Sequence, residues 1–224
     1  MPGDVIGGIE LKQGDILLER AELGLTHSFI VIGQKLGNFK NILSLSSSKA
    51  RTVHAAIYVG EGRVSQSSGE GLTTDPLNGN HKWKVYRYNA NAELAAAAAD
   101  VAQNMVIRSQ NDAGFGKYKT LGNRSAVASA FKPGRKAALS ANDVSSYLDN
   151  LYSGDQSARM KTRSFFCSNF TVLCYSLASE WFGNNPHYAM NLDFERTSPS
   201  EMARYFESRE GKSKGWTRVG EIKG

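Results

Sequence analysis

The stretch that decides the fold is residues 54–66, which read His-Ala-Ala-Ile-Tyr-Val-Gly-Glu-Gly-Arg-Val-Ser-Gln. Val53–Val59 is rich in β-branched and aromatic residues, which is typical of a buried strand. The Glu-Gly pair that follows predicts a tight turn, and the residues up to Gln66 then form the return strand. Cross-strand pairing in such a hairpin brings residues near His54 beside residues near Gln66. The stretch therefore predicts a hairpin that carries a histidine and a glutamine close together.

Outside this hairpin, strands and helices cluster along the chain instead of alternating. Alternating units would indicate a parallel sheet, whereas clustered elements favour the α+β class. Hydrophobic patterns predict further strands at Gly14–Glu19, Trp83–Tyr88 and Trp216–Ile222. Helical spacing and capping residues predict helices at Ser28–Leu36, Asn91–Ile107, Ser140–Leu151 and Ser164–Phe182, and one that begins at Ser198-Pro199-Ser200-Glu201.

The composition indicates a single globular domain over residues 1–224. The chain is 41% hydrophobic and 21% charged, which are ordinary values for a folded protein. Lysine and arginine number 27 against 21 aspartate and glutamate residues, which gives a net charge of +6. A basic protein favours anionic partners such as cell-wall polymers or lipid head groups. The basic residues are scattered and are not interleaved with aromatic ones, so we expect no nucleic-acid partner.

The two cysteines and the N-terminus bear on where the protein is made. Cys167 and Cys174 would lie two turns apart on a helix, about 10 Å along its axis, which is too far for a disulfide. A chain without disulfides is typical of a reducing compartment. The N-terminus shows no basic region followed by an apolar run, so we expect synthesis in the cytoplasm without a signal peptide. No apolar stretch is long enough to predict an integral membrane segment.

Cys167 is the strongest candidate for a reactive side chain. It sits in the first turn of the expected helix Ser164–Phe182, where the helix dipole and the unpaired amides would stabilise a thiolate. An amide at the same helix end could also donate to an oxyanion. Cys174 lies deeper in the same apolar helix, and we interpret it as a small buried hydrophobic residue.

His54 is the histidine best placed to act as a general base for that thiol. The other three, His27, His81 and His187, fall in expected loops or at a helix start. Only His54 falls on an expected core strand, where its geometry could be fixed.

Two residues compete for the role of orienting the His54 imidazole. Gln66 lies on the neighbouring strand of the hairpin, and a polar side chain there could fix the tautomer of the ring. Asp15, in Gly14-Asp15-Ile16, is the alternative. The chain shows no C-x-x-C or H-E-x-x-H spacing, so we expect neither a metal nor another cofactor.

These blocks resemble the permuted NlpC/P60 group of papain-like cysteine hydrolases, which includes lecithin:retinol acyltransferase-like proteins and the bacterial YiiX- or YebB-like hydrolases. The histidine block precedes the cysteine block, as in that group and in contrast to ordinary papain-like enzymes. The resembling segments are Gly14-Asp15-Ile16-Leu17, the hairpin from His54 to Val64, Phe166-Cys167-Ser168-Asn169-Phe170 and the Pro199 region, which together cover about a third of the chain. Ala56 and Asn169 depart from the usual glycine and acidic residue of the group, and Gln66 stands where the group commonly has glutamate or histidine.

The resemblance implies a circularly permuted papain-like fold, with an antiparallel sheet packed against helices and the nucleophile at a helix N-terminus. Cys167 would then be the nucleophile, His54 the general base and Gln66 the third polar residue. The region from Lys119 to Thr162 has no counterpart in the group and is interpreted as a helical insertion.

The function that follows is a cysteine peptidase or amidase that forms an acyl-enzyme. Peptidoglycan peptides are the substrate that the group suggests, and a basic protein without a signal peptide would fit an antibacterial effector with a secretion or immunity partner. One alternative is a lipid acyltransferase or thioesterase, with Phe29–Ile32 and Leu36 forming an apolar surface. Another is a degenerate binding module, which the changes at Ala56, Gln66 and Asn169 would favour.

Overall fold

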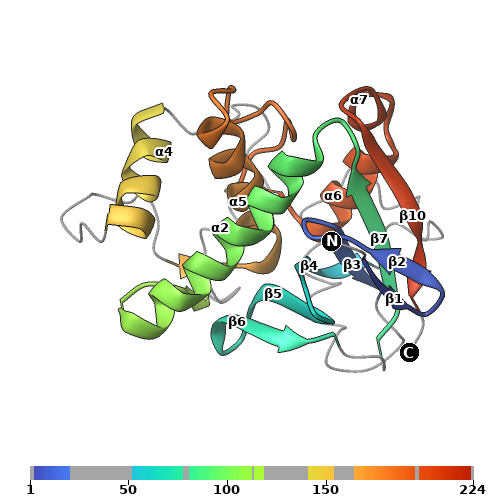
Figure 1. Cartoon of the computed structure of the whole chain (residues 1–224), viewed down its shortest axis with the longest axis horizontal. Helices are drawn as coiled ribbons and strands as arrows, with labels where there is room; N and C mark the ends of the chain where they lie inside the picture. The colour runs from blue at the N-terminus through green and yellow to red at the C-terminus, as the bar shows by residue number, and fades with distance from the viewer. Residues whose placement is uncertain are drawn as a thin grey trace, which may run out of the picture.

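The computed structural model describes residues 3–20, 52–77, 81–112, 114–118, 141–153, 164–194 and 197–222. A six-stranded antiparallel sheet forms the centre of this part of the chain (Figure 1). Its strands, in spatial order, are β10 (Trp216–Ile222), β7 (Trp83–Tyr88), β3 (Ile16–Arg20), β4 (Thr52–Gly60), β5 (Arg63–Ser68) and β6 (Gly71–Pro76). Helices pack against this sheet, so the predicted α+β class is confirmed.

Different elements pack on the two faces of the sheet, and β4 contributes side chains to the hydrophobic core on each face. Ala55, Ile57 and Val59 belong to a core shared with helices α2 (Ala92–Asn111), α5 (Cys167–Trp181) and α6 (Pro199–Glu207). Ala56 and Tyr58 belong to a smaller core on the opposite face. There the hairpin of β1 (Asp4–Ile6) and β2 (Ile9–Leu11) packs with the sheet. The alternation follows from the two-residue period of a strand.

The predicted hairpin is confirmed in position and register. Ala56 pairs with Gln66, Ile57 with Ser65 and Tyr58 with Val64. The turn has positive φ angles at Gly60, Glu61 and Gly62, which two glycines adopt without strain. Strands β7 and β10 have the bounds that the sequence predicts.

The starts of α2 and α6 follow the sequence, whereas the end of α2 does not. Ser198 and Glu201 form the expected capping box at the start of α6. The side chain of Asn91 caps α2, but that helix continues beyond the predicted end at Ile107 to Asn111. Elements that the sequence did not indicate are β1, β2, β6, α7 (Arg209–Ser213), β8 (Lys117–Tyr118) and β9 (Ser164–Phe165).

Two predicted regions fall wholly or mostly outside the described residues. The helix expected at 28–36 lies outside them, as does the apolar surface expected from the same segment. Of the predicted insertion 119–162, the structure describes only α4 (Ala141–Leu148) and a π-helical turn, η3 (Asp149–Ser153). Within the part of the chain that is described, no helix has the length and hydropathy needed to cross a bilayer.

Candidate active site

His54 and Gln66 contact each other directly on neighbouring strands. Gln66 pairs with Ala56, two residues after His54 on β4, so the side chains of His54 and Gln66 share a face of the sheet. The His54 Nε2 and Gln66 Oε1 atoms are 2.8 Å apart, which is a good hydrogen-bond distance. The structure therefore brings together the pair that the hairpin spacing predicts.

Cys167 is the first residue of α5, because the chain before it is extended. Ser164–Phe165 forms strand β9, and Phe166 remains in the β region at φ −112° and ψ 164°. The sequence predicts a start at Ser164, and the later start makes Cys167 the first helical residue and not the fourth. The first backbone hydrogen bond within α5 runs from the Phe170 amide to the Phe166 carbonyl. The Cys167 amide consequently has no acceptor inside the helix and is available to a ligand.

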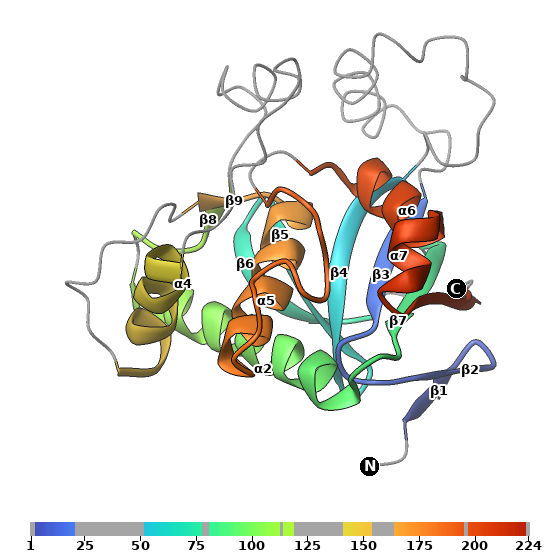
Figure 2. The same cartoon turned by 90° about the horizontal axis from the view of Figure 1, so that it is seen from above.

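Three side chains fix the beginning of α5 against its surroundings. Asn169 accepts a 2.9 Å hydrogen bond from the Phe166 amide and so occupies the reciprocal position of a capping box. Ser67 on β5 donates to the Phe165 carbonyl, and Ser168 donates to the Thr197 carbonyl. Both serines are buried. Helix α5 itself lies across β4 and β5 (Figure 2).

The Cys167 thiol lies within hydrogen-bond reach of His54 and shifts the pKa of the imidazole. Burial lowers the pKa of His54, but the charge of Cys167, its hydrogen bond and the hydrogen bond to Gln66 outweigh burial and raise the pKa to about 9. Because Nε2 faces Gln66, the other ring nitrogen, Nδ1, is left for the thiol. Cys167 is only 6% exposed, so the thiol is largely shielded from solvent.

Gln66 has a second partner, Asp75, which the sequence did not single out. The Gln66 Nε2 amide donates to Asp75 Oδ2 at 2.8 Å, and the Thr73 hydroxyl donates to the same oxygen at 2.5 Å. On β6 the direct partner of Gln66 is Thr73, so Asp75 occupies the diagonal position on the same face. Finding Asp75 from the sequence would have required predicting β6.

Glu19, His81 and Trp83 complete the surroundings of His54. Glu19 on β3 pairs with His54 across the strands, is nearly buried, and is one of the charges that raise the pKa of His54. Its carboxylate lies 2.7 Å from Nδ1 of His81, which is 38% exposed. The rings of Trp83 and His54 are in a T-shaped arrangement, with their centroids 6.2 Å apart.

Asp15 does not take the role of orienting His54 that was considered for it. Its backbone lies beside Tyr58, at the opposite end of β4 from His54. Its side chain is 1% exposed and forms a bidentate pair with Arg87, at 2.8 Å to Nε and 2.7 Å to Nη2. The Lys12 amide also donates to it. These partners occupy the Asp15 carboxylate, and Gln66 is the residue that contacts the imidazole.

Gly14 has a steric reason to precede Asp15. Its φ is +87°, and a Cβ there would lie 2.2 Å from the Ala95 carbonyl oxygen in α2. Only glycine allows the sheet and the helix to approach this closely. Gly14 and Asp15 therefore have a structural role, because they connect the start of β3 to α2 and β7.

Cys174 matches its interpretation as a core residue. It is completely buried, its sulfur lies 3.9 Å from that of Met105, and burial raises the pKa of its thiol well above the usual value. Both cysteines are free thiols. A buried neutral thiol is unreactive, so Cys174 serves as an internal control for Cys167.

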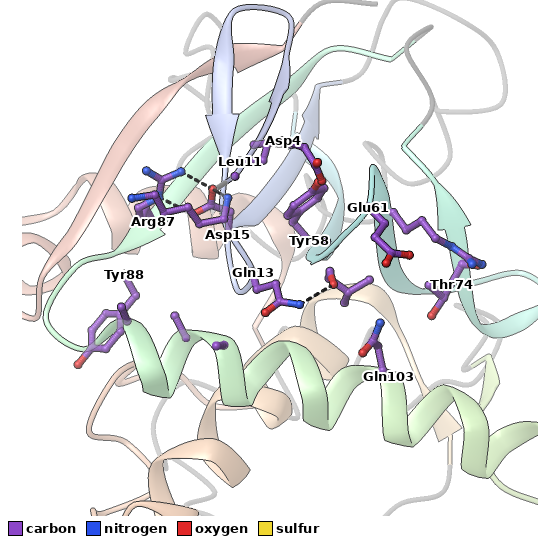
Figure 3. Close-up of a pocket in the computed structure, with 18 of the residues that line it drawn as sticks. Asp4, Leu11, Gln13, Asp15, Tyr58, Glu61, Thr74, Arg87, Tyr88 and Gln103 are labelled. Carbon is purple, nitrogen blue, oxygen red and sulfur yellow. Dashed lines mark hydrogen bonds and ion pairs between the residues drawn. The ribbon is translucent and has the colours of Figure 1, made fainter. Parts of the chain in front are cut away.

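A pocket of about 1030 Å³ lies at the other end of β4, between the β1–β2 hairpin, the β4–β5 turn and α2 (Figure 3). Three of the charged residues that line it have partners: Arg87 binds Asp15, and Asp4 accepts from the Tyr58 hydroxyl. Neither His54 nor Cys167 lines it. This pocket is therefore separate from the candidate active site.

The comparisons with protein-family models, with curated proteins and with solved structures gave no match to this chain. Over the described ranges, no group of three or more histidine, cysteine or carboxylate side chains is placed to hold a metal ion. Any function proposed for the protein therefore rests on the geometry around Cys167 and His54.

Proposed function

We propose that the protein is a cysteine hydrolase that cleaves an amide bond through an acyl-enzyme on Cys167. The observation that carries the proposal is the contact between Cys167 and His54 at the start of α5, with Gln66 on the other side of the imidazole. A thiol, a base and a group that orients the base are the parts that covalent catalysis by cysteine requires.

The proposed reaction has two halves, in which Cys167 is first acylated and then freed. His54 Nδ1 takes the proton of the Cys167 thiol, and the sulfur attacks the substrate carbonyl carbon. The Cys167 amide donates to the oxyanion that forms. The carbon–nitrogen bond then breaks, and His54 returns its proton to the leaving amine. In the second half His54 takes a proton from water and the resulting hydroxide attacks the thioester. The carbon–sulfur bond then breaks to release the acid, and His54 returns its proton to the Cys167 sulfur.

The three departures from the NlpC/P60 pattern are compatible with this chemistry. Gln66 hydrogen-bonds His54, Asn169 caps the helix that carries Cys167, and Ala56 is completely buried beside Gln66. Each residue that differs from the pattern therefore has a defined structural position in the candidate active site. This supports an active hydrolase over a degenerate binding module.

For the substrate, we propose the peptide stems of peptidoglycan. The resemblance to the permuted NlpC/P60 group suggests this class, and the net charge of +6 suits an anionic cell-wall polymer. An antibacterial effector delivered by contact-dependent secretion, with an immunity partner in the producing cell, is the biological setting that fits such an activity.

The substrate class is tested by incubating the protein with purified peptidoglycan and, separately, with phospholipid vesicles. We expect wild-type protein and the Cys174→Ala variant to release peptide fragments from peptidoglycan, because Cys174 takes no part in the reaction. We expect Cys167→Ala to release none. Release of fatty acid by wild-type protein alone would instead indicate a lipid acyltransferase or thioesterase, and no release from either material would count against the hydrolase.

A further inference from the structure

We propose that Asp75 is a positioning residue for this reaction, and that it acts on His54 through the side-chain amide of Gln66. The inference rests on the proposed function and deepens it. It extends the site from three side chains to four, Cys167, His54, Gln66 and Asp75, which lie on α5, β4, β5 and β6.

The side-chain amide of Gln66 can point either way, and Asp75 selects one of the two orientations. A glutamine side chain has a donor end and an acceptor end, and its neighbours decide which end points where. An ionised carboxylate is only an acceptor, so Asp75 binds the NH₂ group of Gln66, at 2.8 Å. The Gln66 carbonyl oxygen must then point the other way, and it lies 2.8 Å from Nε2 of His54.

The orientation of the amide in turn fixes the tautomer of the imidazole. A carbonyl oxygen is only an acceptor, so Nε2 of His54 must carry a hydrogen. In neutral histidine the other nitrogen is then unprotonated, and Nδ1 is the atom left to face Cys167. Only this tautomer can accept the thiol proton. The same series of hydrogen bonds favours protonated His54, because its two ring nitrogens then donate to the Gln66 oxygen and to the Cys167 sulfur.

Thr73 helps to hold the Asp75 carboxylate in the position from which it binds Gln66. Its hydroxyl donates to the same Oδ2 atom at 2.5 Å, so the carboxylate is held by two donors. The other charged or titratable groups around His54 in the described chain are Cys167 from α5 and Glu19 from β3, whose carboxylate also contacts His81. None of these contacts fixes which end of the Gln66 amide faces His54, and Asp75 does.

The variant that tests the proposal is Asp75→Asn, which keeps the size of the side chain. An asparagine can donate as well as accept, so the Gln66 amide is free to turn over and present its NH₂ group to Nε2. We expect the pKa of His54, followed by NMR of histidine-labelled protein, to fall below its wild-type value. We also expect the alkylation of Cys167 by iodoacetamide at pH 7 to slow by about tenfold or more.

Two further variants separate positioning from general structural damage. Thr74→Val, on the opposite face of the same strand, removes a hydroxyl that contacts Ser65 and should leave both readouts near wild type. The double variant Gln66→Glu/Asp75→Asn restores the order of donors and acceptors, because a carboxylate at position 66 would accept from both His54 and the new amide. A carboxylate at position 66 raises the pKa of His54 by its own charge, so the double variant is compared with Gln66→Glu alone. We expect Asp75→Asn to change the pKa of His54 and the alkylation rate much less in the Gln66→Glu background than in wild type, which a merely structural role of Asp75 would not explain.

The inference is overturned if Asp75→Asn behaves like Thr74→Val, or if Asp75→Asn changes both readouts as much in the Gln66→Glu background as in wild type. Failure of the proposed function has a different signature, namely wild-type Cys167 that is alkylated at a rate independent of His54. The NMR titration reports on the path from Asp75 to His54 in either case, so the two failures are distinguishable.

Discussion

Replacing His54 by glutamine is expected to remove nearly all hydrolysis, with a fall in kcat/KM of about 10⁴-fold or more if Cys167 and His54 act as one unit. Glutamine keeps a polar side chain on β4 but can neither take the thiol proton nor carry the charge that stabilises a thiolate. The alkylation of Cys167 by iodoacetamide at pH 7 should therefore fall as well, by roughly tenfold or more. Release of peptide fragments from peptidoglycan and mass spectrometry of the alkylated cysteine measure the two effects.

His81→Gln is the matched control for this substitution. The rings of His81 and His54 lie at the same centroid distance, 6.2 Å, from Trp83. His81 contacts Glu19, and a glutamine in its place can still donate to that carboxylate. We expect His81→Gln to retain most of the activity. Equal losses of activity in the two variants would contradict a specific catalytic role of His54.

Replacing Arg87 by leucine is expected to destabilise the fold by about 3–5 kcal/mol, because it leaves a buried carboxylate without its countercharge. Asp15 is 1% exposed, and Arg87 binds both of its oxygens and also the Glu10 carbonyl. The midpoint of urea unfolding measures the loss of stability. If Asp15 has only a structural role, Cys167 in the remaining folded protein should be alkylated at the wild-type rate.

Arg218→Leu provides the comparison for an exposed ion pair. Arg218 lies on the neighbouring strand β10, is 46% exposed and pairs with Glu221. Exposed pairs contribute at most about 1 kcal/mol, so this variant should unfold close to the wild-type midpoint. Arg87→Lys keeps the positive charge without the bidentate geometry, so its unfolding midpoint should lie between those of Arg87→Leu and Arg218→Leu. An Arg87→Leu variant as stable as Arg218→Leu, or one that slows alkylation of Cys167, would contradict the role given to Asp15.

The parts of the site that the sequence predicted are those set by local patterns. The hairpin from His54 to Gln66 follows from β-branched residues around a glycine-rich turn, and its register then fixes which residues are neighbours. The start of α6 follows from a capping box. Such patterns span only a few neighbouring residues, so they can be recognised in the sequence without knowledge of the tertiary structure.

The missed parts depend on tertiary context. Strand β6 has the sequence Gly-Leu-Thr-Thr-Asp-Pro, and its glycine, aspartate and proline are poor strand formers that an edge position tolerates. Asp75 was overlooked for this reason. The start of α5 was placed too early because Ser164–Phe165 continues the apolar run, although it pairs with β8 as a strand. The choice between Gln66 and Asp15 required knowing where Arg87 lies.

The pKa of His54, compared between wild-type protein and Cys167→Ala, tests the central pairing most directly. A histidine whose pKa is raised by a thiolate keeps its proton through neutral pH and loses it only as the pH rises through that value. We predict a midpoint of about 9 in wild-type protein. In Cys167→Ala the charge and the hydrogen bond of the thiol are gone while the burial remains, so the midpoint should fall. An NMR titration that finds the same midpoint in both proteins would contradict the pairing of Cys167 with His54.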